Sequence, residues 1–152
     1  MDLHSSPATL RVATDAARAA GASVGFVPTM GALHAGHASL VERARRDHGC
    51  VVVSVFVNPT QFNDAADLEA YPRTIDADLA LLSSLEVDLA YLPGVDDVYP
   101  EGVDAVPEVD LPDVAAPLEG AMRPGHFEGV VAVVGRLLEA VGPCTLYLGE
   151  KD

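Results

Sequence analysis

VGFVPTMGALHAGH, residues 24–37, decides the fold of this chain because it joins an apolar run to a glycine-containing turn and two histidines. Residues 24–27 are continuously apolar, which is typical of a buried strand, and helical spacing of apolar residues begins at residue 38. A buried strand that leads through a short turn into a helix is the first half of a β-α-β unit. The stretch therefore predicts an α/β fold.

Three further apolar runs have the same character. The predicted strands are residues 24–27, 51–57, 87–92 and 145–148, and helical spacing appears at residues 38–46, 75–85 and 130–141. Continuous rather than alternating apolar strands, separated by helices, indicate a parallel sheet that is covered on both faces. We expect a doubly wound, Rossmann-like sheet.

Two segments are less regular. A first helix is expected to begin near Thr14 or Asp15, either of which can cap it, and to end at Gly21. Residues 93–124 contain many Pro and Asp residues, which predicts an irregular excursion with a short strand near residues 108–111. Such a segment is either a functional loop or an acidic solvated connection, and both interpretations stay open.

Composition narrows the class of protein. A chain of 152 residues with 49% hydrophobic content can bury one core, which predicts a single domain. The formal net charge of −14 argues against a nucleic-acid or anionic-membrane partner. The sequence shows no leader and no apolar run of the roughly 18 residues that a membrane span needs, so a cytoplasmic protein is expected. Cys50 and Cys144 lack zinc-site spacing, and we predict that both are buried strand residues.

Ligands of open parallel sheets bind beyond the carboxyl ends of the strands, which here directs attention to residues 28–37, 58–64 and 149–152. His34 and His37, three residues apart at a helix start, would project from the same side with Cβ atoms about 5–6 Å apart. Gly36 would let a ring or a phosphate approach the backbone, and the N–H groups of the helix start would attract an anion. This arrangement suits nucleotidyl transfer, although His34 and His37 could be ordinary surface residues and Asn58 only a turn residue.

The HxGH pattern after the first strand is similar to the signature of the nucleotidyltransferase superfamily. The longer string PTMGALHAGHASLV resembles the pantothenate synthetase family, and further blocks follow in family order: SVFVNPTQF at residues 54–62, YPRT at 71–74, MRPGHFEGVV at 122–131 and LGEKD at 148–152. This resemblance implies a ligase that joins pantoate to β-alanine at the expense of ATP through a pantoyl-adenylate intermediate. It also implies a fold of the HxGH nucleotidyltransferase type.

The resemblance also implies roles for individual residues. Those that would contact ATP are Met30, Gly31, His34, Gly36, His37, Gly149, Glu150, Lys151 and Asp152. Those that would contact pantoate are Pro28, Met30, Gln61, Val133, Val134 and Leu137. The catalytic group would comprise His37 as proton donor, His34, and Lys151 as the counter-charge at the reacting centre. Arg123 and His126 fall in a family block without a definite role.

A magnesium ion would be held mainly by the ATP phosphates, with Asp78 assisting directly or through water. A plain acidic cluster favoured by the helix dipole is the alternative interpretation of residues 75–78. The family often forms homodimers, so a homodimer is compatible with this sequence.

The resemblance implies that residues 1–152 are the N-terminal nucleotide- and pantoate-binding domain, with the sheet incomplete at its C-terminal end and the C-terminal domain absent. Three functional hypotheses therefore stay open. The chain is part of an active ligase completed by other segments, an ATP- and pantoate-binding fragment without turnover, or another HxGH nucleotidyltransferase.

Overall fold

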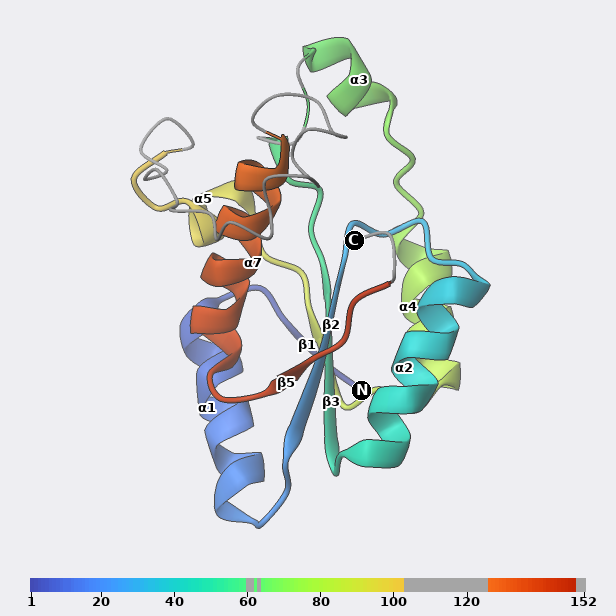
Figure 1. Cartoon of the computed structure of the whole chain (residues 1–152), viewed down its shortest axis with the longest axis vertical. Helices are drawn as coiled ribbons and strands as arrows, with labels where there is room; N and C mark the ends of the chain where they lie inside the picture. The colour runs from blue at the N-terminus through green and yellow to red at the C-terminus, as the bar shows by residue number, and fades with distance from the viewer. Residues whose placement is uncertain (60–61, 63, 103–125, 150–152) are drawn as a thin grey trace.

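A five-stranded parallel sheet runs through the centre of the protein with helices on both faces (Figure 1). The computed structural model describes residues 1–59, 62, 64–102 and 126–149, with side chains from residue 131 onward in the last range. The strands are β1 Asp2–His4, β2 Val24–Thr29, β3 Cys50–Val55, β4 Leu89–Tyr91 and β5 Thr145–Leu146. The helices are α1 Pro7–Ala19, α2 Ala35–Asp47, α3 Ala65–Ala70, α4 Ile75–Ser84, α5 Val95–Val98 and α7 His126–Val141.

The strand order β1-β4-β3-β2-β5 confirms the predicted doubly wound sheet. From β2 the chain proceeds outward through β3 to β4, and it then returns to place β5 on the other side of β2. The order therefore reverses at β2, and the carboxyl end of β2 is the switch point at which ligands bind in such sheets. Residues 30–37 follow that end as predicted, whereas Pro28 and Thr29, which were predicted to come after the strand, are its last two residues.

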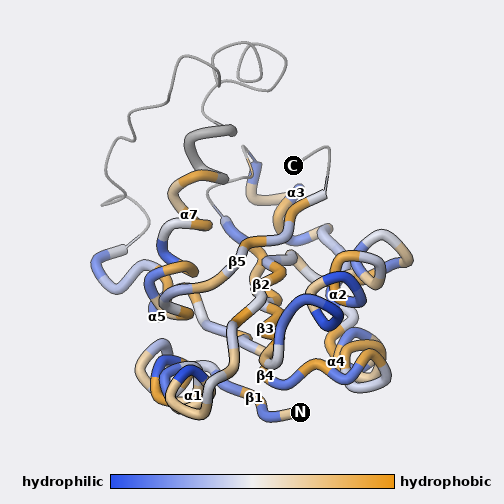
Figure 2. The backbone as a smooth tube through the Cα atoms, turned by 60° about the horizontal axis from the view of Figure 1, so that its bottom comes forward, coloured by the Kyte–Doolittle hydropathy of each residue, from blue (hydrophilic) through white to orange (hydrophobic). Residues whose placement is uncertain are grey.

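Two apolar layers sandwich the sheet. One layer packs β2, β3 and β4 against α1 and α7 through Leu10, Phe26, Val52, Tyr91 and Leu137 among others. The second packs the opposite faces of these strands against α2 and α4 through Val27, Val41, Val53 and Leu82 among others. In Figure 2 the strands lie between α1 and α7 on one side and α2 and α4 on the other. Burial on both faces explains why the strand sequences are continuously apolar.

The start of the first helix differs from the prediction. Helix α1 begins at Pro7, and the Ser6 side chain caps it by accepting a hydrogen bond from the Ala8 N–H at 3.2 Å. Thr14 lies buried in the middle of the helix, where its hydroxyl donates to the Val141 carbonyl at 2.8 Å. The prediction of Thr14 or Asp15 as the cap was wrong because Ser-Pro is itself a start signal, with Pro at the first helical position. The prediction for Gly21 is confirmed, since it follows the C-cap with a φ of +94°.

Other boundaries follow from local chemistry. Helix α2 begins three residues before the predicted residue 38 because His34 serves as its N-cap. Residues 95–98 form the short helix α5 within the segment that was predicted to be irregular, where the Asp97 carboxylate accepts from the Gly94 N–H. The strand predicted near residues 108–111 lies outside the described residues.

The two cysteines differ in environment. Cys50 is buried in β3 as predicted, whereas Cys144 is only partly buried and lies just before β5, so that half of the prediction was wrong. Burial raises the pKa of both thiols, which disfavours the reactive thiolate. None of the helices in the described part of the chain is both long enough and apolar enough to cross a bilayer.

A hydrogen-bonded chain ties the end of α2 to the residue after β5. The Ser23 hydroxyl contacts His48 Nδ1 at 2.8 Å, and His48 Nε2 contacts the Tyr147 hydroxyl at 2.8 Å. Tyr147 in turn donates its hydroxyl proton to the Asp47 carboxylate at 2.8 Å. These contacts fix the chain where it enters residues 148–152.

Replacing Tyr147 with Phe is expected to raise the pKa of Asp47 toward its ordinary value. The hydrogen bonds from Tyr147 and then Arg43 hold the pKa of Asp47 below that value in the folded protein. The stabilisation is therefore present above the unfolded-state pKa and is lost as pH falls through the lowered folded-state pKa. Carboxyl titration by NMR tests this, and an unchanged Asp47 pKa in Y147F would contradict the assignment.

Candidate functional site

The loop between β2 and α2 turns sharply as soon as the strand ends. The Thr29 hydroxyl donates to the Ser54 carbonyl on β3 at 2.8 Å and accepts from the Gly31 N–H at 3.2 Å. Gly31 and Ala32 both have positive φ, at +81° and +50°. This left-handed conformation is strained for Ala32, so the loop needs contacts from outside it to keep its shape.

Asp78 supplies those contacts from the first turn of α4. One carboxylate oxygen accepts from the Ala32 N–H and the other from the Leu33 N–H, each at 3.0 Å. The Thr74 hydroxyl lies 3.2 Å from both oxygens. Asp78 is only 3% exposed, so these donors satisfy a carboxylate that would otherwise be buried and unpaired.

His34 and His37 cap the start of α2 reciprocally. His34 Nδ1 accepts from the Gly36 N–H at 3.0 Å, and His37 Nδ1 accepts from the His34 N–H at 3.2 Å. The ring centroids are 4.0 Å apart. This is the geometry of a capping box with imidazoles in place of the usual hydroxyl and carboxylate. The prediction that both histidines lie on the same side at a helix start is confirmed.

The capping geometry also fixes the tautomer of each ring. Because Nδ1 accepts a backbone N–H in both His34 and His37, the proton of each neutral imidazole lies on Nε2. The pair thus offers two Nε2–H donors at the start of a helix whose N–H groups favour an anion. A Cβ at Gly36 would lie 2.8 Å from His34 Cε1, so a larger residue here would push the His34 ring out of its capping position.

The residues predicted to contact pantoate are in two places. Pro28 and Met30 are partly buried at the end of β2 and the start of the loop. Val133 and Leu137 are buried in the layer between α7 and the sheet, and Val134 packs against that layer. The structure thus places Pro28 and Met30 at the histidine loop, and Val133 and Leu137 in the core layer that α7 shares with β2.

Several predicted contacts fall outside the described residues. Gln61, Glu150, Lys151 and Asp152 are among them, as are Arg123 and the side chain of His126. Gly149 is described and is partly buried three residues after β5. Because β5 pairs with β2, Gly149 follows the strand next to the one that leads into the histidine loop.

Asp78 does not fit the role of a direct magnesium ligand. Both of its oxygens accept hydrogen bonds from backbone and hydroxyl donors, and the residue is buried. Among the residues that the structure describes, no group of three or more His, Cys, Asp or Glu side chains could hold a metal ion. The sequence did not reveal the contacts of Asp78 with residues 32 and 33, because nothing in the local pattern links positions 46 residues apart.

Asn58 has a structural contact. It is 1% exposed, and its side-chain oxygen accepts a hydrogen bond from the Tyr99 hydroxyl at 2.9 Å. This bond joins the segment after β3 to the segment after α5. Of the two interpretations of Asn58, the described geometry supports the structural one.

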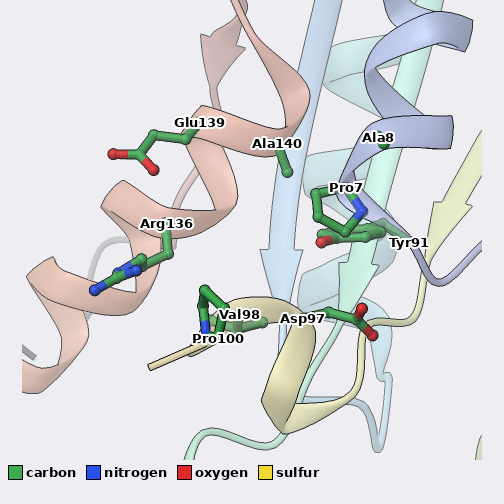
Figure 3. A pocket seen from close by; sticks show the side chains of 9 residues that line it. All are labelled: Pro7, Ala8, Tyr91, Asp97, Val98, Pro100, Arg136, Glu139 and Ala140. Carbon is green, nitrogen blue, oxygen red and sulfur yellow. The ribbon is translucent and has the colours of Figure 1, made fainter. Parts of the chain in front are cut away.

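A cavity of about 370 Å³ lies away from the histidine loop, between α1, α5 and α7 (Figure 3). Its lining residues are Pro7, Ala8, Tyr91, Asp97, Val98, Pro100, Arg136, Glu139 and Ala140. Burial, and secondarily the charge of Asp97, raises the pKa of Tyr91 to about 12, so its phenol stays protonated near neutral pH. The cavity contains none of the predicted site residues and does not coincide with the loop.

The histidine loop is compatible with several families of the nucleotidyltransferase superfamily, and comparison with known proteins shows which family this chain belongs to. The family model for pantoate-beta-alanine ligase matches residues 2–152. This chain belongs to the pantoate-β-alanine ligase family.

Relatives within the pantoate-β-alanine ligase family are similar over most or all of the chain. The pantothenate synthetase of Rhizobium etli is 51% identical over 152 residues, which is 100% of this chain and 50% of that protein. The pantoate-β-alanine ligase of Schizosaccharomyces pombe is 53% identical over 132 residues, which is 87% of this chain and 47% of that protein. The chain therefore spans about half the length of the curated relatives that it matches.

Solved structures of the family share the fold. A pantothenate synthetase from Thermus thermophilus matches with a TM-score of 0.82 and 49% identity over 99% of this chain and 52% of that one. The pantoate-β-alanine ligase of Francisella tularensis, in complex with beta-gamma ATP and β-alanine, matches with a TM-score of 0.88 and 40% identity over 99% of this chain and 57% of that one. The predicted α/β architecture is thus the architecture of this family.

Proposed function

We propose that residues 1–152 form the nucleotide- and pantoate-binding domain of a ligase that joins pantoate to β-alanine with ATP. The reciprocal capping of α2 by His34 and His37, at the switch point of the sheet, is the observation that carries this proposal. It places two imidazole N–H donors and a helix N-terminus together, which is suited to phosphate oxygens. Membership in the pantoate-β-alanine ligase family supports the identity of the substrates.

In the proposed reaction a carboxylate oxygen of pantoate attacks the α-phosphorus of ATP. The bond from the α-phosphorus to the bridging oxygen breaks, and pyrophosphate leaves. The amine of β-alanine then attacks the carbonyl carbon of pantoyl adenylate, and AMP leaves with the acyl C–O electron pair. Neither step needs a covalent intermediate on the protein, so positioning and electrostatic stabilisation supply the catalysis.

Separate groups of residues are proposed to bind the nucleotide and pantoate. His34 and His37 donate from Nε2 to phosphate oxygens, and Gly36 keeps the His34 ring in its capping position. Pro28, Met30 and Gln61 are proposed to hold pantoate, with Val133, Val134 and Leu137 as its apolar wall. Met30, Gly31, Gly149, Glu150 and Asp152 are proposed to contact the nucleotide, and Lys151 to offset negative charge at the reacting centre.

Magnesium is proposed to arrive with the ATP phosphates rather than on Asp78, whose oxygens are engaged by the loop. It would neutralise charge on the departing pyrophosphate. A cytoplasmic location, which is expected from the sequence, and a homodimer, which the sequence allows, complete the proposal.

The assay that tests the proposal supplies ATP, pantoate and β-alanine to the chain and follows pyrophosphate, AMP and pantothenate. Release of all three supports a ligase, and pyrophosphate release that needs pantoate but yields no pantothenate supports the half-reaction alone. ATP binding without any pyrophosphate release would support the second candidate, a binding domain without turnover. A chain that binds neither ATP nor pantoate would contradict the proposal.

A further inference from the structure

Asp78 occupies the position at which the histidine loop would bind an anion. The N–H groups of the successive residues Ala32 and Leu33 point to one carboxylate, in a turn where Gly31 and Ala32 have positive φ. Successive N–H groups in such a conformation form a concave anion site, called a nest. In this protein the nest is filled by a side chain from α4.

From this geometry we infer that Asp78 is a positioning residue, which holds the loop in the shape that orients His34 and His37 toward the nucleotide. The effect on nucleotide binding rests on the proposed function, because Asp78 and the histidines belong to the same site. It also assigns the nucleotide phosphates to the histidines and the start of α2, since the nest is already occupied.

The carboxylate also connects two of the sequence blocks. Thr74 is the N-cap residue of α4, yet its side chain makes no cap bond, because the hydroxyl contacts Asp78 instead. Burial, and secondarily the charge of Asp78, raises the pKa of Tyr71. The YPRT block at residues 71–74 and the loop at residues 28–37 therefore meet at Asp78.

The loop is closely packed against Asp78 and β3. A Cβ at Gly31 would lie 3.1 Å from Asp78 Oδ2 and 3.2 Å from Val55 Cγ1. The loop thus packs directly on the carboxylate, and movement of either one displaces the other. The loop passes into His34 and Gly36 without an intervening element, so its shape reaches the capping box.

Asp78→Asn is the sharpest variant, since the side chain is nearly isosteric. Both oxygens accept N–H donors, so the amide group of Asn would face a backbone donor whichever way it is turned. Asp76→Asn is the matched control, because it removes the same charge from the same helix turn at an exposed position. Leu82→Ala, buried in the core on the same helix, controls for loss of stability without removing the carboxylate.

Two measurements on the full chain test the inference: hydrogen exchange of the Ala32 and Leu33 amides, and the dissociation constant for ATP by calorimetry. For Asp78→Asn we expect amide exchange and the dissociation constant each to rise at least about tenfold, as for loss of a hydrogen bond to a charged group. Asp76→Asn should change neither, and Leu82→Ala should lower the melting temperature while the folded protein keeps its affinity.

Wild-type exchange or wild-type affinity in Asp78→Asn, in a chain that binds ATP, would overturn the inference and leave the proposed function standing. If the unmodified chain binds no ATP, the proposed function fails, and the exchange rates still decide whether Asp78 holds the loop. If Asp78→Asn does not fold, Thr74→Val is measured, because it removes only the hydroxyl partner of the carboxylate. About threefold faster exchange of the two amides is then expected, and unchanged exchange overturns the inference.

Discussion

Replacing His37 with alanine or glutamine is expected to lower the rate of the proposed pantoyl-adenylate formation at least about 100-fold, a loss typical of one transition-state donor. The structure shows why both variants should have this effect. His37 Nδ1 accepts the His34 N–H, so its proton lies on Nε2. Alanine has no donor, and a glutamine that caps the helix through Oε1 has its N–H donors on the neighbouring amide nitrogen, where they differ in direction from the ring Nε2–H. The measurement is the rate of pyrophosphate release with ATP and pantoate.

The two variants differ in what they do to the helix. Glutamine at the third helical position is a regular partner in capping boxes, so His37→Gln should keep the cap that His37→Ala loses at a cost of about 1 kcal/mol. His4→Gln, on the edge strand β1 that pairs with β4 and not with β2, is the control for removing a histidine outside the histidine loop. If the His37→Gln protein forms the adenylate at the wild-type rate while the His37→Ala protein is slow, His37 acts only by capping the helix and takes no direct part in the chemistry.

Replacing Phe26 with alanine is expected to lower the free energy of unfolding by about 3–5 kcal/mol. Phe26 is fully buried in β2, which lies between β3 and β5, and it packs in the layer that α1 and α7 share with the sheet. Truncation leaves a cavity at the junction of these elements, where regular pairing on both sides of β2 limits collapse. Domains are commonly stable by only about 5–15 kcal/mol, so this is a large share.

Urea unfolding measures the effect of Phe26→Ala. Val12→Ala is the matched control, because Val12 is an apolar residue of α1 that is 71% exposed, and exposed substitutions usually stay within about 0.5 kcal/mol. Equal losses for Phe26→Ala and Val12→Ala would contradict the described packing of β2.

The sequence predicted the central sheet because its strands are buried on both faces. β2 and β3 are apolar at successive positions, and no helix pattern competes with that signal. β1 could not be predicted in the same way, since it has three residues at the sheet edge and two of them are exposed. Its position depends on pairing with β4, which a local pattern does not reveal.

The candidate site divides along the same line. The histidine pair was predictable, because strand, turn and helix signals are contiguous over residues 24–37. The role of Asp78 could not be predicted from the sequence. Two of its partners lie in the loop between β2 and α2, and the third lies at the start of α4, so the contacts join segments that are distant in the sequence. Thr14 shows the same limit: a good capping residue by type is instead buried, and it bonds to a carbonyl 127 positions away.

The pairing of β2 with β5 has a consequence for biosynthesis. Gly25 and Phe26 find their second neighbours only at Thr145 and Leu146, so one flank of β2 has no strand beside it until those two residues have left the ribosome. Arg18 on α1 likewise cannot donate to the carbonyls of Val141 and Pro143 until those residues have been synthesised. A nascent chain that has reached only α5 would thus present an apolar, unpaired strand, which is a surface that chaperones protect.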